Sequence, residues 1–177
     1  MWNLEKFGGF VEGEGSFGMG HCSARGHKRG ILARQFTVTL RGDDGPCLES
    51  MRDWLGYGTY TKRPLREGYG VPGHKRQYHH PEANFQVGRK RDQLSLVRKL
   101  DEYQWVTKKE NDYLIWRVGI FMANDGKFVP RNEDAIRICE LIQDVRKYGS
   151  DAEGCVAEAR AIHAKYNAAV GAQDQLL

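Results

Sequence analysis

The segment that most constrains the fold of this chain is a glycine-rich stretch near its start, FGGFVEGEG, at residues 7–15. Apolar residues recur at helical spacing from Trp2 onward, which predicts a helix that ends at about Gly13. Each glycine inside a helix costs about 1 kcal/mol relative to alanine. Close packing of a second helix against the small face formed by Gly9 and Gly13 would offset that cost.

Two carboxylates, Glu12 and Glu14, lie at the predicted C-terminal end of this helix. That end of a helix dipole is negative and disfavours carboxylates, and a bound divalent cation would reverse the effect. The alternative is an exposed acidic turn. The letters GEGSFG also resemble the phosphate-binding loop of kinases, but here the glycines follow a helix and the chain has no HRD or DFG motif. The sequence therefore excludes kinase-type ATP binding.

The remaining chain predicts strands in its first half and helices in its second. The clearest strand is 31–41, where Arg34, Phe36, Val38 and Leu40 share one face and Gln35, Thr37, Thr39 and Arg41 share the other. Further strands are predicted at 16–25, 57–63 and 84–89. Helices are predicted from Asp43 or Asp44 to Gly56 and at 91–103, 108–122, 133–147 and 151–168. The order αββαββα, followed only by helices, is that of an α+β fold.

The charge distribution indicates an anionic partner. The net charge is +4, no acidic residue occurs from Phe17 to Arg41, and eight Lys/Arg stand against two acids from Tyr57 to Arg91. A solvated charged surface is the alternative. The four cysteines form no CxxC pair, which is typical of reduced thiols. No apolar run spans a membrane and no secretion signal is present, so an intracellular, cytoplasmic or organellar, protein is expected.

Residues 7–15 resemble the signature of the LAGLIDADG homing endonucleases, with Ser16 and Phe17 continuing it. The resemblance extends to Phe36–Leu40, to Leu48 with the segment 55–58, and to 106–116, and it covers roughly residues 2–122. It implies an αββαββα core with an antiparallel four-stranded DNA-binding sheet. We assign the core to residues 1–130. Residues 131–177, called the C-terminal extension below, are expected to be a helical part of the same domain whose role is unassigned.

The resemblance also implies a metal-dependent catalytic site. Glu14 is the metal-binding acid, with the Gly13 carbonyl as a further ligand of Mg²⁺, or of Mn²⁺ or Ca²⁺ in its place. Lys109, or alternatively Lys108, supplies positive charge near the scissile phosphate. Glu12 matches an acid that more often helps to hold the helix pair or its surroundings. Leu40 stands where many members carry a polar residue, and the neighbouring Arg41 is expected to take over its role.

A chain with one signature implies a homodimer, in which two signature helices meet and each subunit reads half of a near-palindromic duplex site. The expected dimer-interface residues are Phe7, Gly8, Gly9, Val11, Glu12 and Gly13. The implied function is a site-specific endonuclease that cuts both strands of double-stranded DNA. The alternatives are a DNA-binding regulator or RNA-intron maturase that has lost cleavage, and a basic scaffold protein.

The four-stranded sheet is expected to enter the major groove with alternate residues facing the DNA. The second strand offers Gln35, Thr37, Thr39 and Arg41. The first strand offers either His21, Ser23 and Arg25 or Cys22 and Ala24, with the polar set preferred. The third strand offers Tyr60 and Lys62, or Thr59, Thr61 and Arg63. The fourth offers Asn84, Gln86 and Lys90, and the turn residues Lys28, Arg29, Lys75 and Arg76 are expected to meet phosphates.

Overall fold

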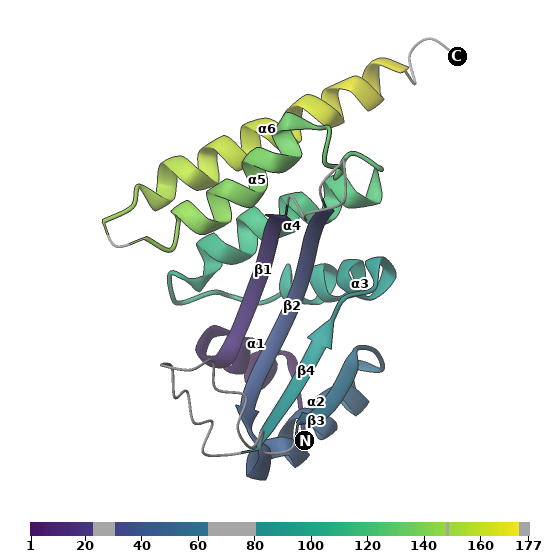
Figure 1. Ribbon diagram of the computed structural model, residues 1–177, viewed down its shortest axis with the longest axis vertical. Coiled ribbons are helices and arrows are strands. Elements are labelled where there is room, and N and C mark those ends of the chain that lie inside the picture. The colour runs from purple at the N-terminus through teal and green to yellow at the C-terminus, as the bar shows by residue number, and fades with distance from the viewer. Residues whose placement is uncertain (23–30, 64–80, 148, 174–177) are drawn as a thin grey trace, which may run out of the picture.

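The computed structural model describes residues 1–22, 31–63, 81–147 and 149–173 and has the predicted α+β order. Its core elements are α1 (Leu4–Glu14), β1 (Gly15–Cys22), β2 (Ile31–Arg41), α2 (Gly45–Leu55), β3 (Thr59–Arg63), β4 (Glu82–Val87), α3 (Lys90–Leu100) and α4 (Lys109–Asn124). The C-terminal extension forms α5 (Glu133–Asp144) and α6 (Ala152–Gln173). Figure 1 shows both helices at one end of the molecule, beyond the sheet.

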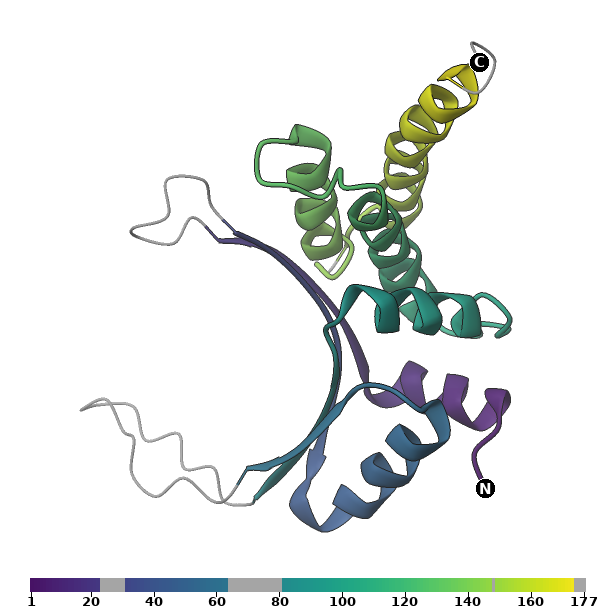
Figure 2. The ribbon, with the colours of Figure 1, turned by 90° about the vertical axis from the view of Figure 1, so that its right-hand side faces the viewer.

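The four strands form one antiparallel sheet in the order β1-β2-β4-β3. The sheet is strongly curved, and Figure 2 shows the core helices on its convex side, while no described helix covers the concave side. We call the concave side the open face. The alternation predicted for residues 31–41 is confirmed, because Phe36 and Val38 are fully buried against the helices while Gln35 and Thr39 are exposed.

The core lies between the convex side of the sheet and helices α1 to α4. It includes Phe17 of β1, Phe85 of β4 and Trp116 of α4, and each of these rings is fully buried. Within the part of the chain described here, no helix is long and apolar enough to cross a membrane.

Two glycines shape the turn between α2 and β3. Gly56 ends α2 as predicted, with φ of 76° and its N–H donated to the carbonyl of Arg52. Gly58 has φ of 93°, and a Cβ there would lie 2.4 Å from the Phe85 ring. Because this pair must turn tightly and pack closely, β3 begins at Thr59 instead of the predicted Tyr57.

The C-terminal extension packs on α4 and on the outer edge of β1. An edge strand leaves backbone carbonyls unpaired. Gln143 donates to the carbonyl of Met19 at 3.0 Å, and the guanidinium of Arg146 donates to the carbonyl of Phe17. The extension therefore covers the edge strand that directly follows the signature helix.

Candidate catalytic site and nucleic-acid interface

The two carboxylates of the signature helix differ in their surroundings. Glu14, the last residue of α1, is exposed and makes no hydrogen bond or ion pair with any residue that the structure describes. Glu12 accepts hydrogen bonds from the N–H groups of Val106 and Thr107 at 2.8 and 3.0 Å. It also accepts one from the hydroxyl of Tyr103 at 3.3 Å. Glu14 is therefore the carboxylate with free oxygens, while Glu12 is committed to the connection between α3 and α4.

These contacts set the ionisation of Glu12. Burial of the carboxylate acts to raise its pKa, but the hydrogen bonds from Val106, Thr107 and Tyr103 outweigh that effect and hold the pKa below its ordinary value. A lowered pKa in the folded state stabilises the fold above the unfolded-state pKa, and this stabilisation is lost as the pH falls through the folded-state pKa.

We expect Glu12→Gln to lower the free energy of unfolding by about 1–3 kcal/mol near neutral pH, because charged hydrogen bonds become neutral ones. Urea denaturation from about pH 6 down to about pH 3 checks this, since the difference from the native chain should shrink as Glu12 becomes protonated. Glu5→Gln, on the first turn of the same helix, is the control. A difference that stays constant across that range would contradict this account.

Burial separates the residues of the signature helix that were predicted to form the dimer interface into two groups. Phe7, Gly8 and Val11 are buried in the chain's own core, so their assignment to the dimer interface was wrong. They lie on the side of α1 that packs under the sheet, a side that glycine content alone does not reveal. Gly9 and Gly13 are exposed, and no atom lies within 4 Å of a Cβ built on Gly13. The small face predicted for a second helix is therefore open.

Gly8 has a different role from Gly9 and Gly13. A Cβ at Gly8 would lie 2.1 Å from the Tyr103 ring, whose hydroxyl donates to Glu12. We expect Gly8→Ala to destabilise the fold by about 1–3 kcal/mol because the ring must move. Thermal unfolding measures this, with Gly20→Ala, where no atom lies within 4 Å of the new Cβ, as the control. Equal melting temperatures for the two variants would contradict the packing described.

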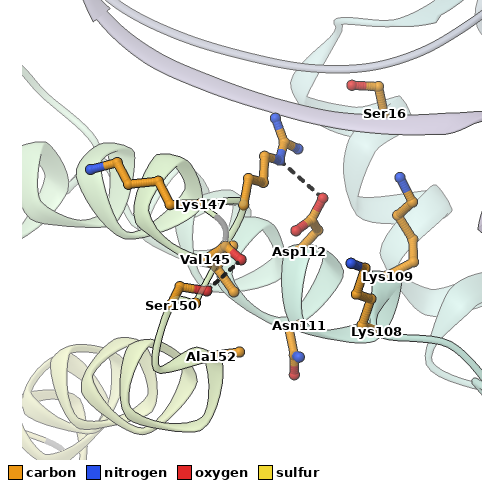
Figure 3. Close-up of a pocket in the computed structure, with 11 residues that line it drawn as sticks. Ser16, Lys108, Lys109, Asn111, Asp112, Val145, Lys147, Ser150 and Ala152 are labelled. Carbon is orange, nitrogen blue, oxygen red and sulfur yellow. Dashed lines mark hydrogen bonds and ion pairs between the residues drawn. The ribbon is translucent and has the colours of Figure 1, made fainter.

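Lys108 and Lys109 stand at the start of α4, directly after the segment that Glu12 holds. Lys108 is exposed and Lys109 is half-buried. The hydroxyl of Thr107 accepts from the N–H of Lys109 at 3.2 Å. Hydrogen bonds therefore connect Glu12 to Thr107 and Thr107 to Lys109. Figure 3 shows both lysines on the same wall of a pocket that Ser16 also lines. Ser16 is two residues beyond Glu14.

The open face carries a band of uncharged polar side chains. The Asn84 amide donates to the Thr39 hydroxyl at 2.8 Å, and the Gln86 amide donates to the Gln35 amide at 3.0 Å. The strand register adds residues to the same face, namely Ser16 from β1, Thr37 and Arg41 from β2, and Thr59, Thr61 and Arg63 from β3. Neighbouring amides and hydroxyls on a curved sheet are suited to reading base edges.

Three assignments in the strands need correction. His21 pairs with Leu32 and shares the parity of Phe17 and Met19, so it lies on the convex side and not on the open face. Tyr60 and Lys62 pair with Phe85 and Ala83 and also lie on the convex side. The alternative set for β3, which includes Arg63, is the one on the open face. Successive side chains of a strand point to opposite faces, so the position of each residue in the strand decides its face.

Lys90 was predicted to extend the fourth strand, but β4 ends at Val87 and Lys90 is the first residue of α3. Its amino group donates to the carbonyl of Asn124 at 2.9 Å, which directs it toward the end of α4. Six other predicted contact residues lie outside the described part of the chain, namely Ser23, Arg25, Lys28, Arg29, Lys75 and Arg76.

The end of β2 shows why Leu40 and Arg41 are not equivalent. Leu40 is half-buried and packs on the core, on the same side as Val38. Arg41 is exposed, lies in the open-face row and pairs with Asp43 at 3.2 Å. A guanidinium at this end of the strand can contact a phosphate or replace the missing polar side chain, whereas Leu40 can do neither.

The oxygen donors at the end of α1 fit a hard divalent cation. Within the described ranges, no group of three or more His, Cys, Asp or Glu side chains could hold a metal ion. Glu14 offers a free carboxylate, and the Gly13 carbonyl belongs to the last turn, where helix carbonyls lack intrahelical partners. Mg²⁺ is commonly held by one or two carboxylates, water and substrate phosphates. The donor set is therefore compatible with Mg²⁺.

Several solved structures resemble this fold. A crystal structure of the homing endonuclease I-TnaI matches with a TM-score of 0.61 and 18% identity, over 91% of this chain and 98% of that chain. The LAGLIDADG meganuclease I-AabMI bound to uncleaved DNA matches with a TM-score of 0.61 and 20% identity, over 81% of this chain and 44% of that one. I-SmaMI bound to an uncleaved DNA target with calcium ions gives 0.64 and 17%, over 85% and 47%.

The chain thus spans about half the length of the two meganucleases and nearly all of I-TnaI. A comparison with curated proteins gives no match. The family model described as LAGLIDADG endonuclease matches residues 7–118, from the signature helix into α4. This chain belongs to the LAGLIDADG endonuclease family.

Proposed function

We propose that the chain is a homing endonuclease that cleaves both strands of a long, near-palindromic DNA site as a homodimer. The observation that carries the proposal is the Glu14 carboxylate, which has no partner among the described residues and lies where α1 joins the sheet whose open face is polar. A carboxylate at a helix C-terminus is unfavourable without a cation, and Glu12 shows that this chain satisfies its other signature acid internally.

The residues of the site divide the chemistry between them. Glu14 holds the metal ion, with the Gly13 carbonyl beside it. When bound, Mg²⁺ would lower the pKa of the attacking water and offset charge on the leaving oxygen. Lys109, with Lys108 next to it, places positive charge beside the scissile phosphate, and Arg41 adds a guanidinium from the end of β2. Glu12 keeps the lysine segment against α1.

Dimer formation is supported by the outer face of α1. Gly9 and Gly13 leave this face without side chains, and glycines one turn apart allow two helix backbones to approach closely. Val106, whose N–H is bound by Glu12, is 81% exposed, so the segment held by α1 also carries an uncovered apolar side chain. A second copy of the chain is the occupant that brings a second Glu14 to the same end.

The open face is proposed to lie in the major groove. Gln35, Thr37, Thr39, Asn84 and Gln86 supply donors and acceptors for base edges. Arg41, Arg63 and the basic segments of the sequence supply the phosphate contacts that fix the register. Thr59 and Thr61 of β3 complete the row.

Selection from a randomised duplex library tests the proposal. The native chain with Mg²⁺ should release fragments whose ends define one sequence with two-fold symmetry, and both strands should be cut. Tight binding of a selected sequence without cleavage would instead identify a DNA-binding regulator. Absence of both binding and cleavage would contradict the proposal.

A further inference from the structure

The pocket beside the two lysines is formed jointly by the family core and the C-terminal extension. It measures about 640 Å³ and lies between the start of β1, the first turn of α4 and the connection from α5 to α6 (Figure 3). Of the lining residues that matter here, the core contributes Ser16, Lys108, Lys109 and Asp112, and the extension contributes Arg146 and Lys147.

The lining of this pocket is strongly basic. Four of its lining residues are cationic, and Asp112 is the one carboxylate among them. Asp112 is only 9% exposed and is paired with Arg146 at 3.0 Å. Lys147 pairs with Asp144 at 2.6 Å, whereas Lys108 and Lys109 form no ion pair with any described residue. The pocket therefore holds positive charge that the described part of the chain does not neutralise.

Two further pockets in the extension show the contrast. One is lined by two cations and two carboxylates, and the other by two cations and three carboxylates, Asp144, Asp151 and Glu158. In these two pockets Lys165 pairs with Asp134 and Arg137 with Glu158. Lys147 lines the second of them as well as the shared pocket, and it pairs with Asp144. Of these three pockets, only the one shared with the core has more cationic than acidic lining residues. It also includes Ser16, which lies two residues beyond the end of the signature helix.

Arg146 is held in a fixed orientation within this pocket. Its Nε donates to Asp112 at 3.0 Å and its Nη2 donates to the carbonyl of Phe17. A guanidinium has five N–H donors, so further donors remain for a ligand. A cation that is already oriented loses less conformational entropy when it binds a phosphate.

The position of the pocket indicates which anion it would meet. Ser16 pairs with Thr37 on the open face and follows Glu14 by two residues. The lysine wall follows the segment that Glu12 binds. The pocket therefore lies at the end of β1 where the duplex would approach the catalytic carboxylate. The anions that a duplex presents at regular spacing are its backbone phosphates.

We propose that this pocket binds a backbone phosphate of the DNA, so that the C-terminal extension takes part in DNA binding as well as in covering β1. Arg146, oriented by Asp112, and Lys147 are the residues that the extension contributes. The inference rests on the proposed function in requiring a DNA ligand, and it adds a role for the connection between α5 and α6.

The salt dependence of duplex binding tests this without knowledge of the target. The probe is a fluorescent mixed-sequence duplex of about 30 base pairs, titrated with Ca²⁺ in place of Mg²⁺. Each neutralised phosphate contributes about −0.9 to the slope of log K against log salt. The variant R146M/K147A should lower the magnitude of that slope by about 1. The matched control R160M/K165A removes one arginine and one lysine from α6, outside the pocket, and should leave the slope unchanged.

The outcomes separate this inference from the proposed function. Equal slopes for the native chain and both double variants, or equal losses in both variants, would overturn the phosphate pocket while leaving DNA cleavage intact. Failure of the native chain to bind any duplex would overturn the proposed function. Arg146 also braces β1, so melting temperatures accompany each titration. If R146M/K147A unfolds, Lys147→Ala is compared with Lys165→Ala, which removes an equivalent exposed lysine–aspartate pair, and a lower slope for Lys147→Ala alone supports the pocket.

Discussion

Glu14→Gln is expected to abolish DNA cleavage while duplex binding in Ca²⁺ changes by less than about tenfold. The amide has nearly the shape of the carboxylate, but it lacks the charge that holds Mg²⁺. Loss of metal-assisted charge stabilisation in the transition state is worth several kcal/mol, and about 4 kcal/mol corresponds to roughly a thousandfold in rate. Because Glu14 is exposed and has no described partner, the fold should be unaffected.

The measurement is single-turnover cleavage of a selected site, with melting temperature and duplex affinity recorded for the same preparations. Glu5→Gln, an exposed acid on the first turn of the same helix, is the control and should cleave at the native rate. Glu12→Gln should lower the melting temperature, while the protein that remains folded should still cleave. Native cleavage by Glu14→Gln would remove the metal-binding role assigned to this residue.

Gly9→Leu is expected to prevent dimerisation while stabilising the isolated subunit. Within the described residues, a Cβ at Gly9 meets only the Tyr103 hydroxyl at 4.0 Å, so the leucine side chain projects from the outer face of α1. Leucine is favoured over glycine in a helix by nearly 1 kcal/mol. In a helix pair that depends on close backbone approach, it would separate the two helices, and we expect dimer affinity to fall by at least about a hundredfold, or about 3 kcal/mol.

Sedimentation equilibrium, with and without duplex DNA, measures the association of Gly9→Leu. Ala157→Leu adds an equivalent apolar side chain at an exposed position of α6 and should leave association unchanged. The opposite signs expected for subunit stability and for dimerisation distinguish a blocked interface from a damaged fold. A Gly9→Leu variant that remains dimeric and cleaves normally would show that α1 is not the contact.

The parts of the fold that sequence predicts well are those where buried apolar residues mark the period. Phe36 and Val38 fixed the faces of β2, and Gly56 marked the end of α2 through its left-handed backbone. In β1, Gly18 and Gly20 carry no side chain to mark a face, so polarity wrongly favoured the set containing His21. Extending the parity of Phe17 through the strand would have placed it correctly.

The site was less accessible to sequence because its contacts join distant segments. Glu12 binds a connection that follows α3, and the partner that makes Gly8 necessary is Tyr103. Neither pairing leaves a local pattern. The same holds for Asp112 and Arg146, which meet only because the C-terminal extension folds back on β1. Helical spacing could suggest that Gly8 and Gly13 share one role, but burial separates them.

The most direct test of the account uses a mixed dimer of one native chain and one Glu14→Gln chain, purified through two different affinity tags. Its substrate is a plasmid with a single selected site. If each subunit brings one Glu14 to a shared centre across the α1 pair, the mixed dimer should nick one strand or leave the plasmid uncut, whereas the native dimer linearises it. Linear product from the mixed dimer at the native rate would contradict the account.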